Sequence, residues 1–157
     1  VLHGHCLGAG LQLALATDIR IATADCQFAI MEAKWGLVAD MGLTRSAMGV
    51  LRADIVKELA MTARIFDGQQ AFDYGVVSHL SDTPMEVAKN LVAELSSRSP
   101  DAVLASKRIT NAMYHTPATT LYQEKLWQIK LLLGQNRKLA VKKAKNETVK
   151  FIGRQFN

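Results

Sequence analysis

The first 80 residues alternate short apolar runs with turns of small residues, which predicts a series of brief strands and helices. We expect apolar strands over residues 1–7 and 27–30, and a strand of alternating polar and apolar residues over 18–23. Between them, the apolar helix formers of residues 11–17 predict a short buried helix. A strand, a tight turn, a helix and a second strand form a crossover unit, so parallel pairing is expected.

Beyond Gly42, apolar residues recur at helical spacing. They predict two helices that meet near residues 52–54, where Asp54 is expected to cap the second helix. A further short helix is expected over residues 69–74, followed by a last strand over residues 76–80.

From residue 81 onward the pattern is helical to the end, with proline or glycine near most boundaries. The expected helices cover residues 84–97, 100–115, 118–133 and 136–150. We therefore predict an α/β fold in two parts, an α/β half over residues 1–80 and an all-helical half over residues 81–157.

Composition narrows the class of protein without defining its function. A chain of 157 residues, 49% hydrophobic and 21% charged, is typical of a globular domain, and its apolar runs are too short to cross a membrane. Cys6 and Cys26 form no metal-binding pattern with histidine, and His3 and His5 have no third ligand at a companion position, so no metal is expected. We expect the cysteines to be small buried residues and the location to be the reducing cytoplasm.

The chain carries a net charge of +5, and its basic residues concentrate between residues 137 and 154. This cluster has two interpretations, a solvated helix face or a phosphate-binding surface. The chain also starts at Val1, inside an apolar run, which leads us to expect a piece of a longer protein.

The turn Gly8-Ala9-Gly10 is the first candidate for chemistry. Backbone N–H groups at a helix start have no partner within the helix, so they can hold a developing negative charge. The turn lacks the glycine spacing of dinucleotide-binding loops, the lysine of phosphate-binding loops and the nucleophile of serine hydrolases.

Two carboxylates, Glu32 and Asp40, stand eight residues apart in an apolar neighbourhood. If both face one cavity, one can act as an acid while the other acts as a base. In the alternative interpretation, Glu32 pairs with a surface cation (Lys34 or Arg45) and Asp40 caps a helix.

The chain resembles the crotonase superfamily of enoyl-CoA hydratases and isomerases over essentially its whole length. The matching positions are Gly4-x-x-x-Gly8-Ala9-Gly10-x-x-Leu13-Ala14-x-x-x-Asp18, Phe28-x-x-x-Glu32-x-x-x-Gly36-Leu37, Glu58-Leu59-x-x-Thr62-x-Arg64, Ala71-x-x-x-Gly75-Val76-Val77, Ser99-Pro100-x-Ala102 and Phe151-Ile152-Gly153-Arg154. The resemblance implies the C-terminal part of a crotonase spiral fold followed by a helical trimerisation region.

The same resemblance implies an acyl-CoA substrate, with coenzyme A as part of the substrate and no further cofactor. The N–H of Ala9, beside Gly8, would stabilise the enolate oxygen, and a second donor would come from a family segment that this chain does not contain. An isolated fragment is therefore expected to have little activity. Hydratases of the family place a second glutamate where this chain has Gln12, so Gln12 argues against two-glutamate hydration.

The run from Gly36 to Gly42 resembles the dienoyl-CoA isomerases, in which an aspartate at the position of Asp40 joins the glutamate at that of Glu32. We therefore expect double-bond isomerisation, with Gly8, Gln12 and Gly36 at the substrate. Three alternatives stay open: a hydratase in which Glu32 works with a water held by Gln12, an RNA-binding protein on the same fold, and a non-catalytic oligomerisation module.

In the helical half, the resemblance implies a homotrimer or a dimer of trimers. The expected interface or lid residues are Leu121, Leu126, Ile129, Leu132 and Leu133. Lys150 and Arg154 are expected to meet the phosphates of coenzyme A. No membrane contact is expected, and nucleic acid is not the expected partner.

Overall fold

The computed structural model describes residues 1–115 and 119–156, without the side chains of His115, Thr120 and Leu121. Two compact units divide the chain, Val1–Asn90 and Leu91–Asn157. The division falls inside helix α5 (Pro84–Ser96), ten residues after the boundary expected from the sequence. None of the described helices is long and apolar enough to cross a membrane.

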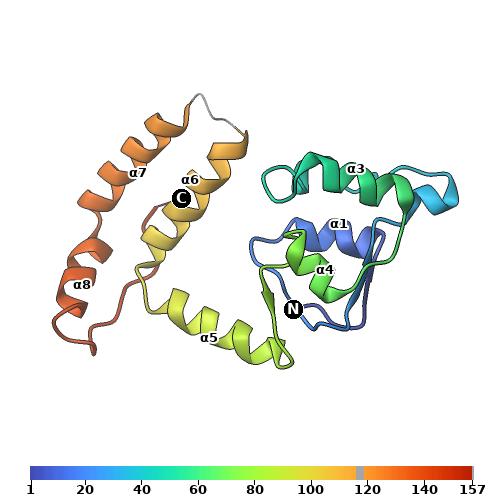
Figure 1. Ribbon diagram of the computed structural model, residues 1–157. Coiled ribbons are helices and arrows are strands. Elements are labelled where there is room, and N and C mark those ends of the chain that lie inside the picture. Colours follow the sequence, from blue (N-terminus) through green and yellow to red (C-terminus); the bar gives the residue numbers. More distant parts are fainter. Residues whose placement is uncertain (116–118, 157) are drawn as a thin grey trace. The chain divides into compact units, whose positions relative to one another are not determined.

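The first unit consists of short elements, and Figure 1 shows its helices α1, α3 and α4 close to one another. Its elements are β1 (His5–Leu7), α1 (Ala9–Leu15), β2 (Ile21–Ala22), β3 (Gln27–Ala29), the 3₁₀ helix η1 (Glu32–Trp35), α2 (Leu43–Ser46), α3 (Ala53–Thr62), α4 (Gly68–Asp73) and β4 (His79–Leu80). Each expected helix and strand of this half has a counterpart, although the strands are shorter than expected.

All strand pairing in the two small sheets is parallel, as expected. Strand β1 pairs with β3, with Cys6 opposite Phe28, and β2 pairs with β4. The single strand expected over residues 1–7 is wrong, because Leu2 pairs with Ala22 beside β2 while β1 pairs with β3. Gly4, whose φ of 69° few other residues adopt, separates the two pairings.

Arg20 lies directly before β2 and ties it to neighbouring segments. Its side chain is buried and donates from Nε to the carbonyl oxygen of Val76 (2.5 Å) and from Nη1 to that of Thr17 (2.6 Å). The backbone carbonyl oxygen of Arg20 also accepts from the N–H groups of Ser78 (2.8 Å) and His79 (3.3 Å), so Arg20 connects the start of β2 to the start of β4. Burial lowers the pKa of the Arg20 guanidinium, and the Asp18 carboxylate opposes that shift.

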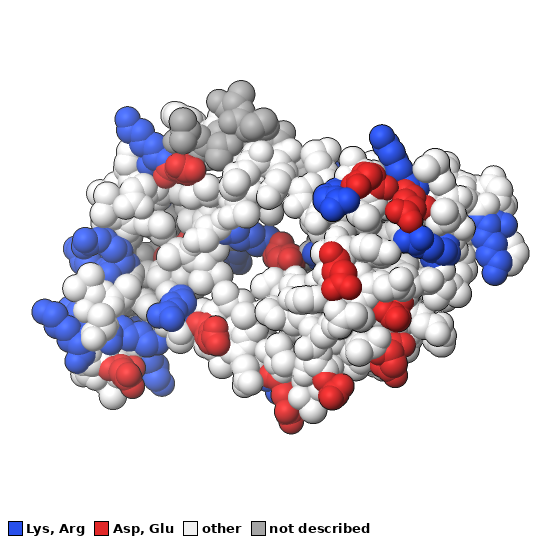
Figure 2. All heavy atoms as spheres, viewed as in Figure 1, with Lys and Arg blue, Asp and Glu red and all other residues white. Residues whose placement is uncertain are grey.

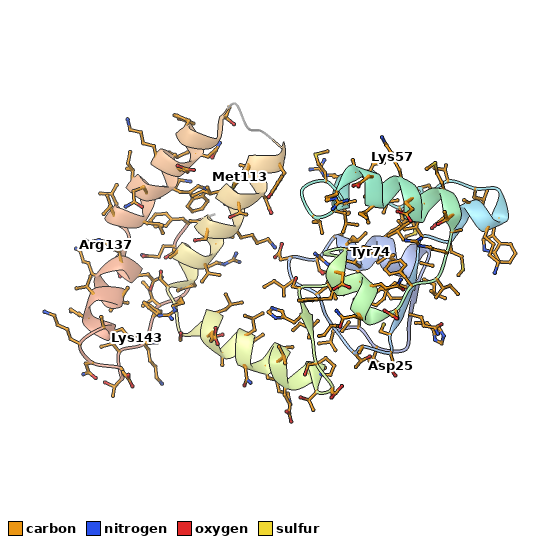
Figure 3. The ribbon with its side chains drawn as sticks, in the orientation of Figure 1. Asp25, Lys57, Tyr74, Met113, Arg137 and Lys143 are labelled. Atoms are coloured by element: carbon orange, nitrogen blue, oxygen red, sulfur yellow. The ribbon has the colours of Figure 1, made fainter. Side chains whose placement is uncertain are left out.

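Aromatic side chains and both cysteines fill the core of the first unit. Phe28 and Phe66 stack with ring centroids 5.7 Å apart, and Tyr74, labelled in Figure 3, meets Phe66 edge-on at 5.8 Å. Cys6 and Cys26 are free and buried, which confirms the expectation of small buried residues. Burial raises the pKa of both thiols.

The prediction that Asp54 caps α3 is wrong. Arg52 occupies the N-cap position, and Asp54 lies in the first turn, where its carboxylate forms an exposed ion pair with Arg52 at 2.5 Å. The hydrogen bond from Arg52 lowers the pKa of Asp54 to about 2. An Asp in the first turn interacts favourably with the helix dipole. An acidic residue near a helix start therefore has the same sequence pattern whether it caps the helix or lies one or two residues inside it.

The second unit contains helices α6 (Pro100–His115), α7 (Thr120–Leu133) and α8 (Gln135–Lys143). Helices α6 and α7 pack side by side (Figure 1). Helix α8 ends at Lys143 rather than at the expected residue 150. The reason is Asn146, whose side-chain oxygen accepts from the backbone N–H (3.1 Å) and hydroxyl (2.7 Å) of Thr148 and stabilises a turn.

After this turn the chain returns to a buried pair, Asp101 and Asn136. Oδ1 of Asp101 accepts from the backbone N–H groups of Gln155 (2.7 Å) and Phe156 (3.3 Å), and Oδ2 accepts from Nδ2 of Asn136 (2.7 Å). Oδ1 of Asn136 in turn accepts from the backbone N–H of Ile152 (3.1 Å). Two buried side chains thus hold the segment 152–156 against the helices.

Candidate active site

The small-residue turn joins β1 to α1 as expected. Gly8 has φ 53° and ψ −122°, and its N–H donates to the carbonyl oxygen of Ala29 at 2.8 Å. Its own carbonyl oxygen accepts from the backbone N–H groups of Leu11 (3.0 Å) and Gln12 (3.2 Å), which starts the helix at Ala9. The N–H groups of Ala9 and Gly10 therefore have no preceding helical turn to receive them, and both residues are exposed.

Glu32 lies beside this turn because β3 runs parallel to β1 and leads through Met31 into η1. A Cβ atom placed on Gly8 would stand 3.6 Å from Oε1 of Glu32. The carboxyl group therefore faces Gly8 across a space about the size of one side-chain carbon. The parallel pairing brings together two residues 24 positions apart in the sequence.

Gln12 connects Glu32 to the loop that follows η1. Its side chain is 1% exposed, and its Nε2 donates to Oε1 of Glu32 at 2.5 Å. Its Oε1 accepts from the backbone N–H of Met41 at 2.8 Å. The other carboxylate oxygen of Glu32, Oε2, is buried and has no hydrogen-bond partner among the residues that the structure describes.

Gly36 turns the chain out of η1 and into the segment 37–41. Its φ of 70° is left-handed, and the next N–H, that of Leu37, donates to the carbonyl oxygen of Glu32 at 3.0 Å. Asp40 is exposed and directly precedes Met41, whose N–H is held by Gln12. The interpretation of Asp40 as a helix cap is wrong, because Gly42 is the N-cap residue of α2.

The arrangement suits proton transfer next to a developing anion. Glu32 has one oxygen bonded to the Gln12 amide and one buried oxygen that no described residue bonds. The N–H groups of exposed Ala9 and Gly10, at the start of α1, follow Gly8 directly in the chain. A carboxylate can remove or return a proton, and backbone N–H groups can stabilise the oxyanion that forms. Within the described part of the chain, no cluster of three His, Cys, Asp or Glu side chains could hold a metal ion.

Lys150 and Arg154 belong to the second unit and are exposed. Figure 2 shows Lys and Arg side chains gathered over α8. Ser97, Arg98, Lys143 and Phe151 help to line a hollow of about 480 Å³, and Nζ of Lys143 lies 4.9 Å from the centre of the Phe151 ring (Figure 3). This hollow was not predicted from the sequence, where its lining residues are separated by some 40 positions.

The family model for enoyl-CoA hydratase/isomerase matches residues 1–145 of this chain. The chain belongs to the enoyl-CoA hydratase/isomerase family. The resemblance to the crotonase superfamily is thereby confirmed, and with it the α/β class of the fold.

Individual relatives agree with this membership. The chain is 34% identical over 159 residues to a mitochondrial Delta(3,5)-Delta(2,4)-dienoyl-CoA isomerase of Pongo abelii, covering 96% of the chain and 48% of that protein. A probable enoyl-CoA hydratase/isomerase from Mycobacterium abscessus superimposes with a TM-score of 0.87 at 26% identity, over 97% of this chain and 60% of that one. A putative enoyl-CoA hydratase from Thermobifida fusca, solved in complex with CoA, gives a TM-score of 0.77 at 30% identity, over 82% of this chain and 51% of that one.

These relatives are named as hydratases and isomerases, so the family is one of enzymes acting on acyl-CoA thioesters. The chain spans about half the length of the curated relatives it matches. The expected roles of Gly8, Ala9, Gln12, Glu32, Gly36, Asp40, Lys150 and Arg154 remain predictions.

Proposed function

We propose that the protein containing this chain moves double bonds in dienoyl-CoA thioesters through an enolate. The observation that carries the proposal is the environment of Glu32. Its Oε2 is buried without a hydrogen-bond partner among the described residues, while Oε1 lies beside the turn that begins α1. An unpaired buried carboxylate oxygen costs stability, so such an oxygen suggests a chemical role.

In the proposed reaction, the thioester carbonyl oxygen lies against the N–H of Ala9. Glu32 removes a proton from the carbon next to the carbonyl, and the electron pair of that C–H bond moves toward the carbonyl oxygen to form an enolate conjugated with both double bonds. Asp40 returns a proton at a more distant carbon, so no net oxidation occurs. Loss of one oxyanion donor lowers such rates by about 10²–10³-fold, so the N–H of Ala9 and a second donor from the whole protein both matter.

The proposed role of Asp40 distinguishes isomerisation from hydration. Isomerisation needs an acid at the far carbon, whereas hydration by Glu32 alone needs only a water. The relative named as a dienoyl-CoA isomerase supports the first reaction, and the segment 37–41, held at Met41 by Gln12, offers Asp40 a defined place in the chain. The acidic site of the first unit, rather than the basic surface of α8, therefore carries the proposal.

The experiment supplies the whole encoded protein with a 3,5-dienoyl-CoA and, separately, with crotonyl-CoA. We expect conversion of the diene to its conjugated 2,4 isomer, followed by its ultraviolet absorbance, and little hydration of crotonyl-CoA. Asp40→Asn is expected to slow diene conversion about 10²-fold or more. Asp25→Asn, a change at an exposed aspartate of the same unit (labelled in Figure 3), is the matched control.

Rapid hydration of crotonyl-CoA that survives Asp40→Asn would overturn the proposal in favour of a hydratase. Inactivity toward both thioesters would instead favour a non-catalytic member of the family.

We further propose that the helical unit assembles a homotrimer, or a dimer of such trimers. Ile129, Leu132 and Leu133 leave an apolar face of α7 exposed, which favours contact with another subunit. Leu126 is half-buried, and the side chain of Leu121 lies outside the described residues. Light scattering of the whole protein at several concentrations tests this: a monomer throughout would contradict it.

Two other assignments belong to the same proposal. Lys150 and Arg154 would bind the phosphates of coenzyme A, and reversing their charge should raise KM for CoA thioesters without changing kcat. The free thiols of Cys6 and Cys26 agree with a reducing compartment such as the cytoplasm.

A further inference from the structure

Gln12 stands at the centre of the site, at a position where an acid would be expected for two-carboxylate hydration. We infer that Gln12 is a positioning residue that anchors Oε1 of Glu32, reserves Oε2 for proton transfer, and fixes the segment that carries Asp40. This inference rests on the proposed function for its chemical meaning, and on two hydrogen bonds for its geometry.

The first bond makes the two oxygens of Glu32 unequal. Nε2 of Gln12 is a donor only, and it lies 2.5 Å from Oε1. A carboxylate oxygen that accepts a strong hydrogen bond has lower proton affinity than one that accepts none. Because Oε2 is buried and lacks a partner among the described residues, it is the oxygen on which an incoming proton would be most stable.

The second bond runs in the opposite sense. Oε1 of Gln12 accepts from the backbone N–H of Met41 at 2.8 Å, so the residue after Asp40 is tied to the same side chain. Gln12 thereby joins positions 20 and 29 residues away along the chain. Proton removal by Glu32 and proton return by Asp40 need fixed separation, which one rigid amide between them helps to supply.

The amide of Gln12 performs both tasks without charge and without a proton that it could lose. An ionised carboxylate at position 12 could accept from Met41 but has no hydrogen to donate to Glu32, and two negative charges would lie at hydrogen-bond distance. Gln12 is 1% exposed, so its burial favours support of Glu32 over direct contact with a substrate. The residue therefore acts through its neighbours rather than on the reacting atoms.

The first test replaces Gln12 by methionine, which keeps the length of the side chain and removes both hydrogen bonds. We expect kcat for the diene to fall about 10–100-fold, as for loss of other groups that orient a reactive residue, with KM changed less than about twofold. Amide hydrogen exchange at Met41 should become faster. Gln69→Met is the matched control, because it removes an exposed amide–carboxylate bond (Gln69 to Asp73, 3.0 Å) elsewhere in the unit.

The second test exchanges the two side chains in the double variant Gln12→Glu with Glu32→Gln. The new pair can still form both hydrogen bonds, with the amide now donating from position 32 to a carboxylate at position 12. We expect normal unfolding temperature and protected exchange at Met41, but no recovery of kcat. The swap separates the hydrogen bonds from proton transfer, because position 32 no longer carries a carboxylate. Loss of Met41 protection in the double variant would contradict the assigned bonds, and turnover near that of the unmodified protein would contradict proton transfer by Glu32.

The two proposals fail in different ways. If the unmodified protein leaves the diene unchanged, isomerisation is wrong, and the role of Gln12 is then decided by Met41 exchange and by exchange of the α-protons of butyryl-CoA with D₂O. That exchange needs the base but not Asp40. Unchanged Met41 protection in Gln12→Met, or unchanged turnover and α-proton exchange, would overturn the inference.

Discussion

Two buried polar clusters, one in each unit, contain similar side chains but differ in how completely their carboxylate oxygens are hydrogen-bonded. In the second unit, both oxygens of Asp101 accept hydrogen bonds and Asn136 acts as donor and acceptor, which ties down the segment 152–156. In the first unit, Gln12 satisfies one oxygen of Glu32 and leaves Oε2 without a partner among the described residues. The difference separates a cluster that stabilises from one that is prepared for a reaction.

The physical reason is the cost of burial. A buried carboxylate is stable where donors surround it, and it loses about 1–3 kcal/mol for each buried polar atom left unpaired. The cluster around Asp101 avoids that loss through three donors, two of them backbone N–H groups. The cluster around Glu32 retains the loss, which a substrate proton can relieve.

The largest expected effect breaks the reactive cluster chemically while keeping its shape. Glu32→Gln should lower turnover by about 10²–10⁴-fold, because an amide cannot transfer the proton. The free energy of unfolding should change by less than about 1 kcal/mol, because no described residue forms a hydrogen bond with Oε2. Steady-state kinetics and urea unfolding measure the two quantities.

Glu58→Gln is the control, since Glu58 forms an exposed ion pair with Arg64 at 2.7 Å. A Glu32 variant that unfolds readily but remains active would reverse the comparison between the two clusters.

The next effect breaks the stabilising cluster. Asp101→Ala leaves the N–H groups of Gln155 and Phe156 and the amide of Asn136 without their acceptor, and should lower the free energy of unfolding by about 2–4 kcal/mol. Urea unfolding measures it, and Asp73→Ala, at an exposed aspartate, should stay within about 0.5 kcal/mol of the parent. Equal losses in both variants would show that burial of Asp101 contributes nothing.

A smaller effect is expected for the reactivity of the buried Cys26 thiol, which stays neutral at ordinary pH. Burial raises the pKa of the Cys26 thiol from 9.0 to about 11. Alkylation by iodoacetamide at pH 8 should therefore be at least about tenfold slower in the folded protein than in urea, as followed by mass spectrometry.

The sign of the linked stability follows from the same shift. The folded protein holds the Cys26 proton more tightly than the unfolded chain does, so this contribution is complete below about pH 9 and disappears as the pH rises toward 11. Stability that increases between these pH values on account of Cys26, measured against Cys26→Ala, would contradict the assignment.

The smallest effect is expected at an exposed carboxylate. Asp54 pairs with Arg52, and the folded-state pKa of about 2 means that any contribution is present above the unfolded value and is lost as the pH falls toward 2. Because both side chains are largely exposed, Asp54→Asn should leave the urea midpoint at pH 7 unchanged. A clear shift of that midpoint would show that the exposed ion pair contributes to stability as much as the buried clusters do.

Local patterns predicted most of the elements, because apolar periodicity and small-residue turns act within a few residues. The turn at Gly8, the short helix after it and the helical second half are examples. The strand pairing was harder to predict: Leu2 and β1 have different partners, and that choice depends on residues some 20 positions away.

The sequence predicted which residues form the candidate site, but it did not predict the hydrogen bonds between them. Glu32 and Gln12 could be named from spacing and family resemblance, whereas their hydrogen bond depends on the parallel alignment of β1 with β3. Asp54 and Arg20 show the same limit, because a side chain's partner depends on packing that no local pattern contains. Asp101 and Asn136 offered no sequence signal beyond a helix start and a polar turn.

The ties of Asp101 also have a consequence for synthesis on the ribosome. Its backbone partners, Gln155 and Phe156, follow it by 54 and 55 positions, whereas the Glu32 cluster is complete once Met41 has emerged. Translation proceeds from the N-terminus, and domains generally fold as units in that order. The reactive cluster can therefore form early, while the second unit cannot complete its buried cluster until residues 152–156 have been made.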